Sequence, residues 1–358
     1  MSRRRAALVT AGLAAGAVAG GAVGRMLLGR RRGDPEAEEP LSMLPPDDLG
    51  MVESFDGTRL AVRAAGDPRN PAIVFVHGFS LDMTTWHYQW TTLSERFRCV
   101  LFDLRSHGRS AAAASGDLSV EAMGRDLVTV LETAVPGPAV VVGHSMGAMS
   151  ILSMAASRPD LLDGPVAGTA FVGAAASDLL RGAMGSVTEL LRPRLGSLSQ
   201  AAQRVNRLRR YVLSAPTDVA GLVARITQFA PEASPHLVRY VVGLAARAPS
   251  AVWTDGLAGL MDVDLRDVLG RVKVPALVMV GEHDRVTPPS SAVVMAGELP
   301  DARLAIIEAA GHMAMLERHE DVSERLAAFA DEVMGSARRA RGAAGGGGGP
   351  SRGRRGRT

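Results

Sequence analysis

Short apolar runs that alternate with helical patterns constrain the fold of this chain more than any other feature. Each run spans four to six residues and is followed by turn residues, as expected for a strand buried on both faces of a parallel sheet. Helical patterns lie between the runs, notably at 120–133 and 149–157. This order predicts an α/β fold with a mostly parallel, doubly wound sheet and helices on both faces. The runs lie at 60–65, 73–76, 100–103, 139–142, 169–172, 277–280 and 304–307.

The alternation stops at about 174–256, between the fifth and sixth of these runs. The pattern there is purely helical, which predicts an inserted helical cap. The α/β domain with this insertion is expected to span 49–334. Before it, the acidic and proline-rich residues 34–48 predict a linker. After it, the Arg- and Gly-rich residues 335–358 predict a disordered tail.

The N-terminal segment 1–33 contains an uncharged run between two arginine clusters. The run has 19 residues, 6–24, and could just cross the hydrocarbon core of a bilayer as a helix. Its glycines recur at every fourth position, a small-residue stripe that packed membrane helices use. We favour a single anchor that makes the protein membrane-associated. A cleaved export signal and a disordered Ala/Gly tail are the alternatives, and the protein would then be exported or cytoplasmic.

The distribution of charge argues against a nucleic-acid partner. The chain has 40 basic and 37 acidic residues, but seven arginines lie in 1–33 and seven in 335–358. All the acidic residues lie in 34–334, which carries a net charge of −11. The basic character therefore belongs to the two ends of the chain, and a basic globular surface for a duplex is not expected.

The strongest chemical signal is the pentapeptide Gly143-His144-Ser145-Met146-Gly147. It follows the apolar run 139–142 directly and precedes a helical pattern, which is the context of a nucleophile elbow. Small residues at both ends of the motif allow a sharp turn that exposes the serine. We therefore predict that Ser145 is a nucleophile. The alternative is a serine that merely caps a helix in a glycine-rich turn.

A serine nucleophile needs a base and a carboxylate that orients the base. His312 follows the run 304–307 and a loop of small residues, so it lies beyond the carboxyl end of a strand, where open α/β sheets bind ligands. Asp284 follows the run 277–280 in the same way, and Glu282 is the main competing carboxylate. The chain order Ser145, Asp284, His312 is the order expected for a nucleophile elbow on such a sheet.

The negatively charged oxygen of an acyl-transfer intermediate needs backbone N–H donors. One donor is expected from Met146, the residue after the nucleophile. The other is expected from Phe79, in the loop that follows the run 73–76, where Gly78 permits a close approach of the backbone.

Over about 50–332, these motifs resemble the α/β-hydrolase superfamily, and the sequence looks most like bacterial hydrolases with a helical cap. The resemblance implies the Ser145–Asp284–His312 triad, the oxyanion donors Phe79 and Met146, and a cap over the pocket. It does not identify the substrate. Five motifs carry the resemblance in the expected order, namely His77–Phe79, Asp103–Ser110, Gly143–Gly147, Gly281–Asp284 and Gly311-His312.

The expected activity is that of a serine hydrolase that cleaves a carboxylic ester or related small acyl substrate through an acyl-enzyme on Ser145, as esterases and lipases do. No metal or organic cofactor is implied. Acyl transfer, perhydrolysis, lactone hydrolysis and C–C bond hydrolysis use the same triad and remain alternatives, as does a non-catalytic binding protein of this fold. Within the superfamily, a serine rather than an aspartate at position 145 disfavours dehalogenase and epoxide hydrolase chemistry.

Overall fold

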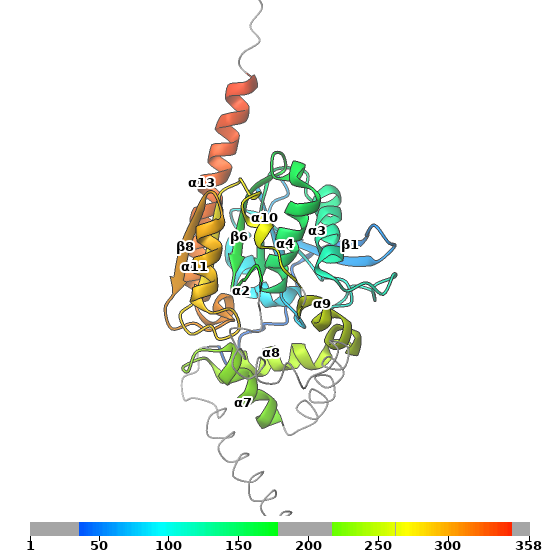
Figure 1. The fold of residues 1–358 in the computed structure, drawn as a ribbon, viewed down its shortest axis with the longest axis vertical. Coiled ribbons are helices and arrows are strands. Elements are labelled where there is room, and N and C mark those ends of the chain that lie inside the picture. The colour runs from blue at the N-terminus through cyan, green and yellow to red at the C-terminus, as the bar shows by residue number, and fades with distance from the viewer. Residues whose placement is uncertain (1–35, 178–216, 262, 346–358) are drawn as a thin grey trace, which may run out of the picture.

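A computed structural model describes residues 36–177, 217–261 and 263–345. Its centre is an eight-stranded sheet with the order β1-β2-β4-β3-β5-β6-β7-β8 (Figure 1). Strands β3 to β8 run parallel to one another, whereas β1 pairs antiparallel with β2 and β2 pairs antiparallel with β4. The predicted mostly parallel sheet is therefore confirmed. The strands are β1 (Asp47–Glu53), β2 (Arg59–Ala65), β3 (Ala72–Val76), β4 (Arg98–Phe102), β5 (Ala139–His144), β6 (Val166–Val172), β7 (Ala276–Gly281) and β8 (Ala302–Ile307).

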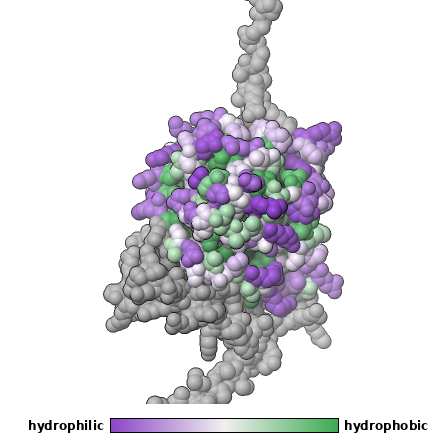
Figure 2. Space-filling model, turned by 90° about the vertical axis from the view of Figure 1, so that its right-hand side faces the viewer, coloured by the Kyte–Doolittle hydropathy of each residue, from purple (hydrophilic) through white to green (hydrophobic). Residues whose placement is uncertain are grey.

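Strand β1 is the one strand of the sheet that the apolar runs did not predict. It lies at the edge of the sheet, and nearly all its residues are exposed, so it has no apolar run. It begins at Asp47, within the predicted linker. Nearby, Leu41 is only 2% exposed and packs into the core, so the described part of 34–48 is attached to the domain. Figure 2 shows the side of the molecule that carries β1, where apolar side chains are scattered among hydrophilic ones.

Helices cover both faces of the sheet, as predicted. Alternate residues of a strand point to opposite faces, so Val74 and Val76 belong to one hydrophobic cluster while Ile73 and Phe75 belong to the other. The first cluster includes residues of α3 (Val120–Ala134), α4 (Met146–Ser157), α10 (Arg266–Leu269) and α11 (Pro289–Glu298). The second includes residues of η1 (Met83–Trp86), α2 (His87–Leu93), α12 (Ala314–Glu317) and α13 (His319–Gly345).

The inserted segment between β6 and β7 is helical, as predicted, in its described part. Figure 1 shows these helices grouped at one end of the molecule. Residues 178–216 of the predicted cap lie outside the described residues. The described cap helices are α7 (Thr217–Gln228), α8 (Pro235–Arg247), the π-helix η4 (Val252–Gly256) and α9 (Leu257–Met261).

The two ends of the chain differ in what the structure describes. Helix α13 continues to Gly345, so the start of the predicted disordered tail at residue 335 is wrong. The C-terminal part of this helix projects from the end of the molecule opposite the cap (Figure 1). The uncharged run 6–24 lies outside the described residues, so the membrane anchor remains a prediction. Within the described part of the chain, no helix has the length and apolar character needed to cross a bilayer.

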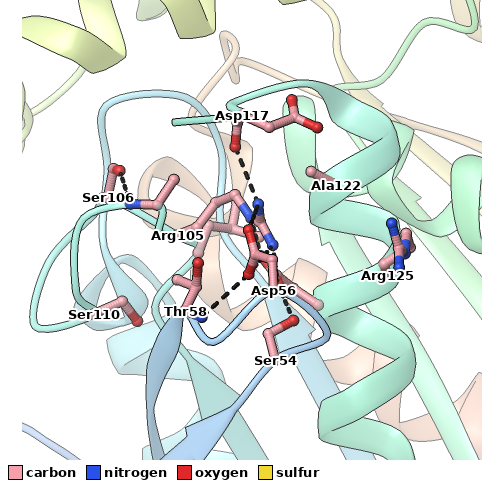
Figure 3. A network of polar contacts seen from close by, with 12 residues as sticks. Ser54, Asp56, Thr58, Arg105, Ser106, Ser110, Asp117, Ala122 and Arg125 are labelled. Carbon is pink, nitrogen blue, oxygen red and sulfur yellow. Dashed lines mark hydrogen bonds and ion pairs between the residues drawn. The ribbon is translucent and has the colours of Figure 1, made fainter. Parts of the chain in front are cut away.

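A buried ion-pair network joins the turn between β1 and β2 to helix α3 (Figure 3). The guanidinium of Arg105 is fully buried and donates from Nε and Nη2 to the carboxylate of Asp126, each at 2.7 Å. Its Nη1 donates to Asp56 in the turn at 3.0 Å. Phe55, also in the turn, lies under the guanidinium groups of Arg105 and Arg125. The network therefore attaches the edge hairpin to the rest of the domain.

Replacing Asp126 with Asn should destabilise the fold strongly. The change removes the fully buried one of the two carboxylates that pair with Arg105, and breaking a buried ion pair from one side costs about 3–5 kcal/mol. The free energy of unfolding, measured by urea denaturation, should fall by that amount. Asp160→Asn is the matched control because Asp160 pairs with Arg158 on the exposed surface, and its denaturation midpoint should hardly move. Equal effects of the two variants would contradict the role of the network.

Candidate active site

The carboxyl ends of five neighbouring parallel strands meet at one edge of the sheet. Because β3, β5, β6, β7 and β8 lie side by side, the loops that follow them start close together. The segments that follow β3, β5, β7 and β8 carry the five predicted site residues, Phe79, Ser145, Met146, Asp284 and His312.

Ser145 occupies a sharp turn between strand β5 and helix α4. Its backbone has φ 50° and ψ −114°, a strained conformation for a residue other than glycine. Gly147 has to be small because a Cβ there would lie 2.3 Å from the carbonyl oxygen of Val76. A Cβ at Gly143 would likewise lie 2.5 Å from the backbone nitrogen of Ala148. The glycines thus let β3, β5 and α4 approach each other, and Ser145 is held at the turn.

Two backbone N–H groups near this turn remain available for a ligand. Met146 is the first residue of α4, where an N–H has no acceptor within the helix. Among the described residues, neither this N–H nor that of Phe79 donates to another protein group. Within the described part of the chain, the N–H groups of Phe79 and Met146 are therefore both free to donate to a ligand.

Two buried histidines hold the loop that carries Phe79. The ring of His77 donates from Nδ1 to the carbonyl of Gly78 and accepts at Nε2 from the N–H of Leu104. His107 accepts at Nε2 from the N–H of Ser80 at 3.3 Å. Burial lowers the pKa of His77 to about 4 and that of His107 to about 3, so both rings are neutral and can accept these bonds. Both histidines belong to motifs identified in the sequence, His77–Phe79 and Asp103–Ser110, but this supporting role was not predicted.

Asp284 and His312 form a buried pair. The Nδ1 of His312 donates to Oδ2 of Asp284 at 2.9 Å, and the two residues are only 5% and 3% exposed. The other oxygen of Asp284 accepts the N–H groups of Val286 and Thr287. The hydroxyl of Thr287 donates to Oδ2 at 2.8 Å. Burial tends to raise the pKa of Asp284, but His312 and these donors outweigh it, so the pKa lies below its usual value.

The competing carboxylate, Glu282, does not contact His312. Its side chain is half exposed and accepts the N–H of Ala309 on the protein surface. Asp284 is therefore the carboxylate that the fold brings to the imidazole. Thr287, which completes the surroundings of that carboxylate, was not predicted as a functional residue. Its position three residues after an aspartate at the end of a strand is the signal that could have identified it.

The residues that flank Ser145 in the chain and in the sheet lie close to His312, and no hydrogen bond joins the Ser145 and His312 side chains in this structure. The ring of the preceding residue, His144, lies 4.7 Å from the ring of His312 and bonds its carbonyl oxygen. The N–H of Ser145 donates to Val172, and a Cβ on the next residue, Gly173, would lie 3.1 Å from Nδ1 of His312. Contacts of this kind are often long in unliganded enzymes and shorten when substrate binds.

The cap lies against this site. The ring of Trp253, in the π-helix η4, meets the ring of Phe79 edge to face at 5.1 Å. The backbone of Gln228, at the end of α7, accepts the N–H of His312 at 2.8 Å. Within the described ranges, no group of three or more His, Cys, Asp or Glu side chains could hold a metal ion.

Replacing Thr287 with Val should weaken the Asp284–His312 pair. The change removes one donor to a buried carboxylate, and such a bond contributes about 1.5–3 kcal/mol. Because the pKa of Asp284 is lowered in the folded protein, this stabilisation is complete above the unfolded pKa of 3.8 and is lost as the pH falls through the folded pKa. Urea denaturation should thus give a lower free energy of unfolding for the variant than for the wild type at pH 7, and this difference should become smaller in acid. Thr133→Val, at an exposed helix position, serves as the control, and a pH-independent difference would refute this account.

Comparisons with known proteins agree on the family. A family model described as the alpha/beta hydrolase family matches residues 73–325. Epoxide hydrolase 3 of Xenopus tropicalis is 25% identical over 79% of this chain and 78% of its own length. An esterase from Exiguobacterium antarcticum has a TM-score of 0.66 and 24% identity over 78% of this chain and 98% of its own. The enol-lactonase from Burkholderia xenovorans has a TM-score of 0.63 and 22% identity, with 78% and 99% coverage. The chain belongs to the α/β-hydrolase family.

Proposed function

We propose that the protein is a serine hydrolase that cleaves a carboxylic ester or a related acyl compound. The observation that carries the proposal is the buried Asp284–His312 pair beside the strained turn of Ser145. The N–H groups of Phe79 and Met146, which have no acceptor in the part of the chain that the structure describes, add to it. A protein that only binds a ligand would not need a nucleophile, a base and an orienting carboxylate together.

In the proposed reaction, Oγ of Ser145 attacks the carbonyl carbon while Nε2 of His312 takes its proton. Asp284 holds the imidazole with Nε2 free and stabilises its positive charge. The N–H groups of Phe79 and Met146 bind the negatively charged oxygen of the tetrahedral intermediate. His312 then protonates the leaving alcohol, and a water molecule activated by the same imidazole releases the acyl group from Ser145.

The same groups would serve other acyl chemistry. Lactone hydrolysis needs the same attack on a cyclic ester, whereas acyl transfer and perhydrolysis differ in the group that accepts the acyl chain. Hydrolysis of a C–C bond would need a carbon leaving group. The epoxide hydrolase among the relatives does not favour epoxide opening here, because that chemistry in this superfamily uses a carboxylate where this chain has Ser145.

Ester hydrolysis should depend on Ser145. On p-nitrophenyl esters of increasing acyl length, Ser145→Ala should lower kcat by about 10⁴-fold or more, because it removes the nucleophile. A fluorophosphonate probe should label the wild type and not this variant. Ser157→Ala, the same change at the end of helix α4, is the control and should react like the wild type. Equal labelling of Ser145→Ala, or no hydrolysis of any ester by the wild type, would count against the proposal.

The alternative reactions, with a cyclic ester as substrate or another acceptor of the acyl group, can be tested with the same enzyme preparations. A lactone series tests cyclic esters, and added alcohol or hydrogen peroxide tests acyl transfer and perhydrolysis through the products formed. A higher kcat/KM for lactones than for every open-chain ester would identify a lactonase. A predominance of transfer product in water would identify an acyltransferase.

A further inference from the structure

The proposed mechanism leaves one buried carboxylate near the site unused. Glu317, the last residue of helix α12, is only 7% exposed. Its Oε1 accepts the N–H of Gly311, the residue before His312, at 2.8 Å. Its Oε2 accepts the N–H of Ala230, in the cap just beyond helix α7, at 2.8 Å. One carboxylate therefore joins the loop of His312 to the cap.

The same two chain segments meet at further points. The carbonyl of Gln228 accepts the N–H of His312 at 2.8 Å and that of Met313 at 3.3 Å. A Cβ on Gly311 would lie 2.6 Å from the backbone carbon of Phe229 and 2.7 Å from the nitrogen of Ala230. The end of the cap helix and the loop of His312 are thus in direct backbone contact, and Glu317 lies where they meet.

The surroundings of Glu317 suit a carboxylate and few other groups. Two N–H donors point at it from different segments, and a carboxylate offers one oxygen to each. Among the described residues it forms no ion pair within 4.0 Å, and burial raises its pKa to about 7 against the effect of the two donors. A buried carboxylate without a cation is costly, so it needs both bonds.

We propose that Glu317 is a positioning residue that attaches the loop of His312 to the cap. The imidazole is then held in its position for catalysis only while the cap contacts this loop. The proposal rests on the proposed role of His312 as the base. Glu317 itself does not reach the reacting atoms through any contact in the structure. It acts through the backbone of Gly311 on one side and Ala230 on the other.

Glu317→Gln is the central test, since the amide keeps the shape but can accept only one of the two bonds. Its NH₂ group would face an N–H donor. With a p-nitrophenyl ester, kcat should fall by about ten- to a hundredfold, because small misplacements of a catalytic group have effects of this size. KM should change by less than about threefold if substrate binding is intact. Hydrogen exchange should become faster at the amides of Gly311 and Ala230 while the strands of the sheet keep their protection.

Two further variants separate positioning from a general effect on folding. Glu320→Gln removes an exposed carboxylate three residues along the chain and should keep the wild-type kcat and exchange rates. Gly311→Ala keeps Glu317 but forces a methyl group against the backbone of the cap, so the loop and the cap have to move apart; the φ of Gly311 is not left-handed, so the effect comes from this contact and not from φ. It should lower kcat without raising KM, as Glu317→Gln does.

The outcomes are distinguishable from failure of the proposed hydrolase activity. If the wild type hydrolyses esters but Glu317→Gln keeps its kcat, the positioning role is wrong while the function stands. The positioning role is also wrong if Glu317→Gln loses activity only through a higher KM. It is wrong as well if Glu317→Gln loses activity because it unfolds while Gly311→Ala keeps the wild-type kcat. If the wild type hydrolyses no ester, unchanged exchange at Gly311 and Ala230 in Glu317→Gln would still refute the attachment to the cap.

Discussion

The parallel pairing of neighbouring strands is the constraint on which the site depends. It sends five loops out of one edge of the sheet, so residues from Phe79 to His312 can meet although the chain separates them widely. The loops also bring backbone N–H groups that no strand partner uses. Some of these bind carboxylates, as at Asp284 and Glu317, and those of Phe79 and Met146 remain free among the described residues. The polarity of the site therefore comes largely from the backbone.

Buried carboxylates are stabilised in two different ways in this molecule. Asp126 is paired with Arg105, and this pair attaches the edge hairpin to helix α3. Asp284 accepts bonds from two N–H groups, a hydroxyl and an imidazole, and no arginine or lysine of the described ranges is bonded to it. A cation bonded to Asp284 would compete with His312 for the same oxygens. Neutral donors keep the carboxylate ionised while leaving the imidazole as its principal partner.

Local patterns predicted the parts of the fold that local sequence determines. The buried strands and the turn at Ser145 each have a sequence pattern only a few residues long, so they were predictable. Strand β1 was not, because an exposed edge strand lacks an apolar run. Nothing local distinguishes Asp284 from Glu282. Asp284 is the one that bonds His312, and the N–H groups of Val286 and Thr287, which bind its other oxygen, depend on the folded loop.

Residues that act between distant segments could not be read from such patterns. Glu317 binds Ala230, 87 positions away in the chain, and nothing near either residue signals the contact. The same holds for the carbonyl of Gln228 and the N–H of His312. The insertion could be predicted as helical from its own pattern, but its attachment to the loop of His312 follows from how the cap docks on the sheet.

Ser145 and His312, the proposed nucleophile and base, differ in whether local or distant contacts set their positions. Ser145 is fixed by one sharp turn between β5 and α4, and its position is set by glycines within two residues of it. His312 lies on a loop whose position depends on bonds from Asp284, from His144 and from the cap. The position of the proposed nucleophile is thus set locally by the sheet, whereas the position of the proposed base depends on several segments. Because the cap contacts the loop of His312 and not the turn of Ser145 through these bonds, a change in the position of the cap would act first on the proposed base.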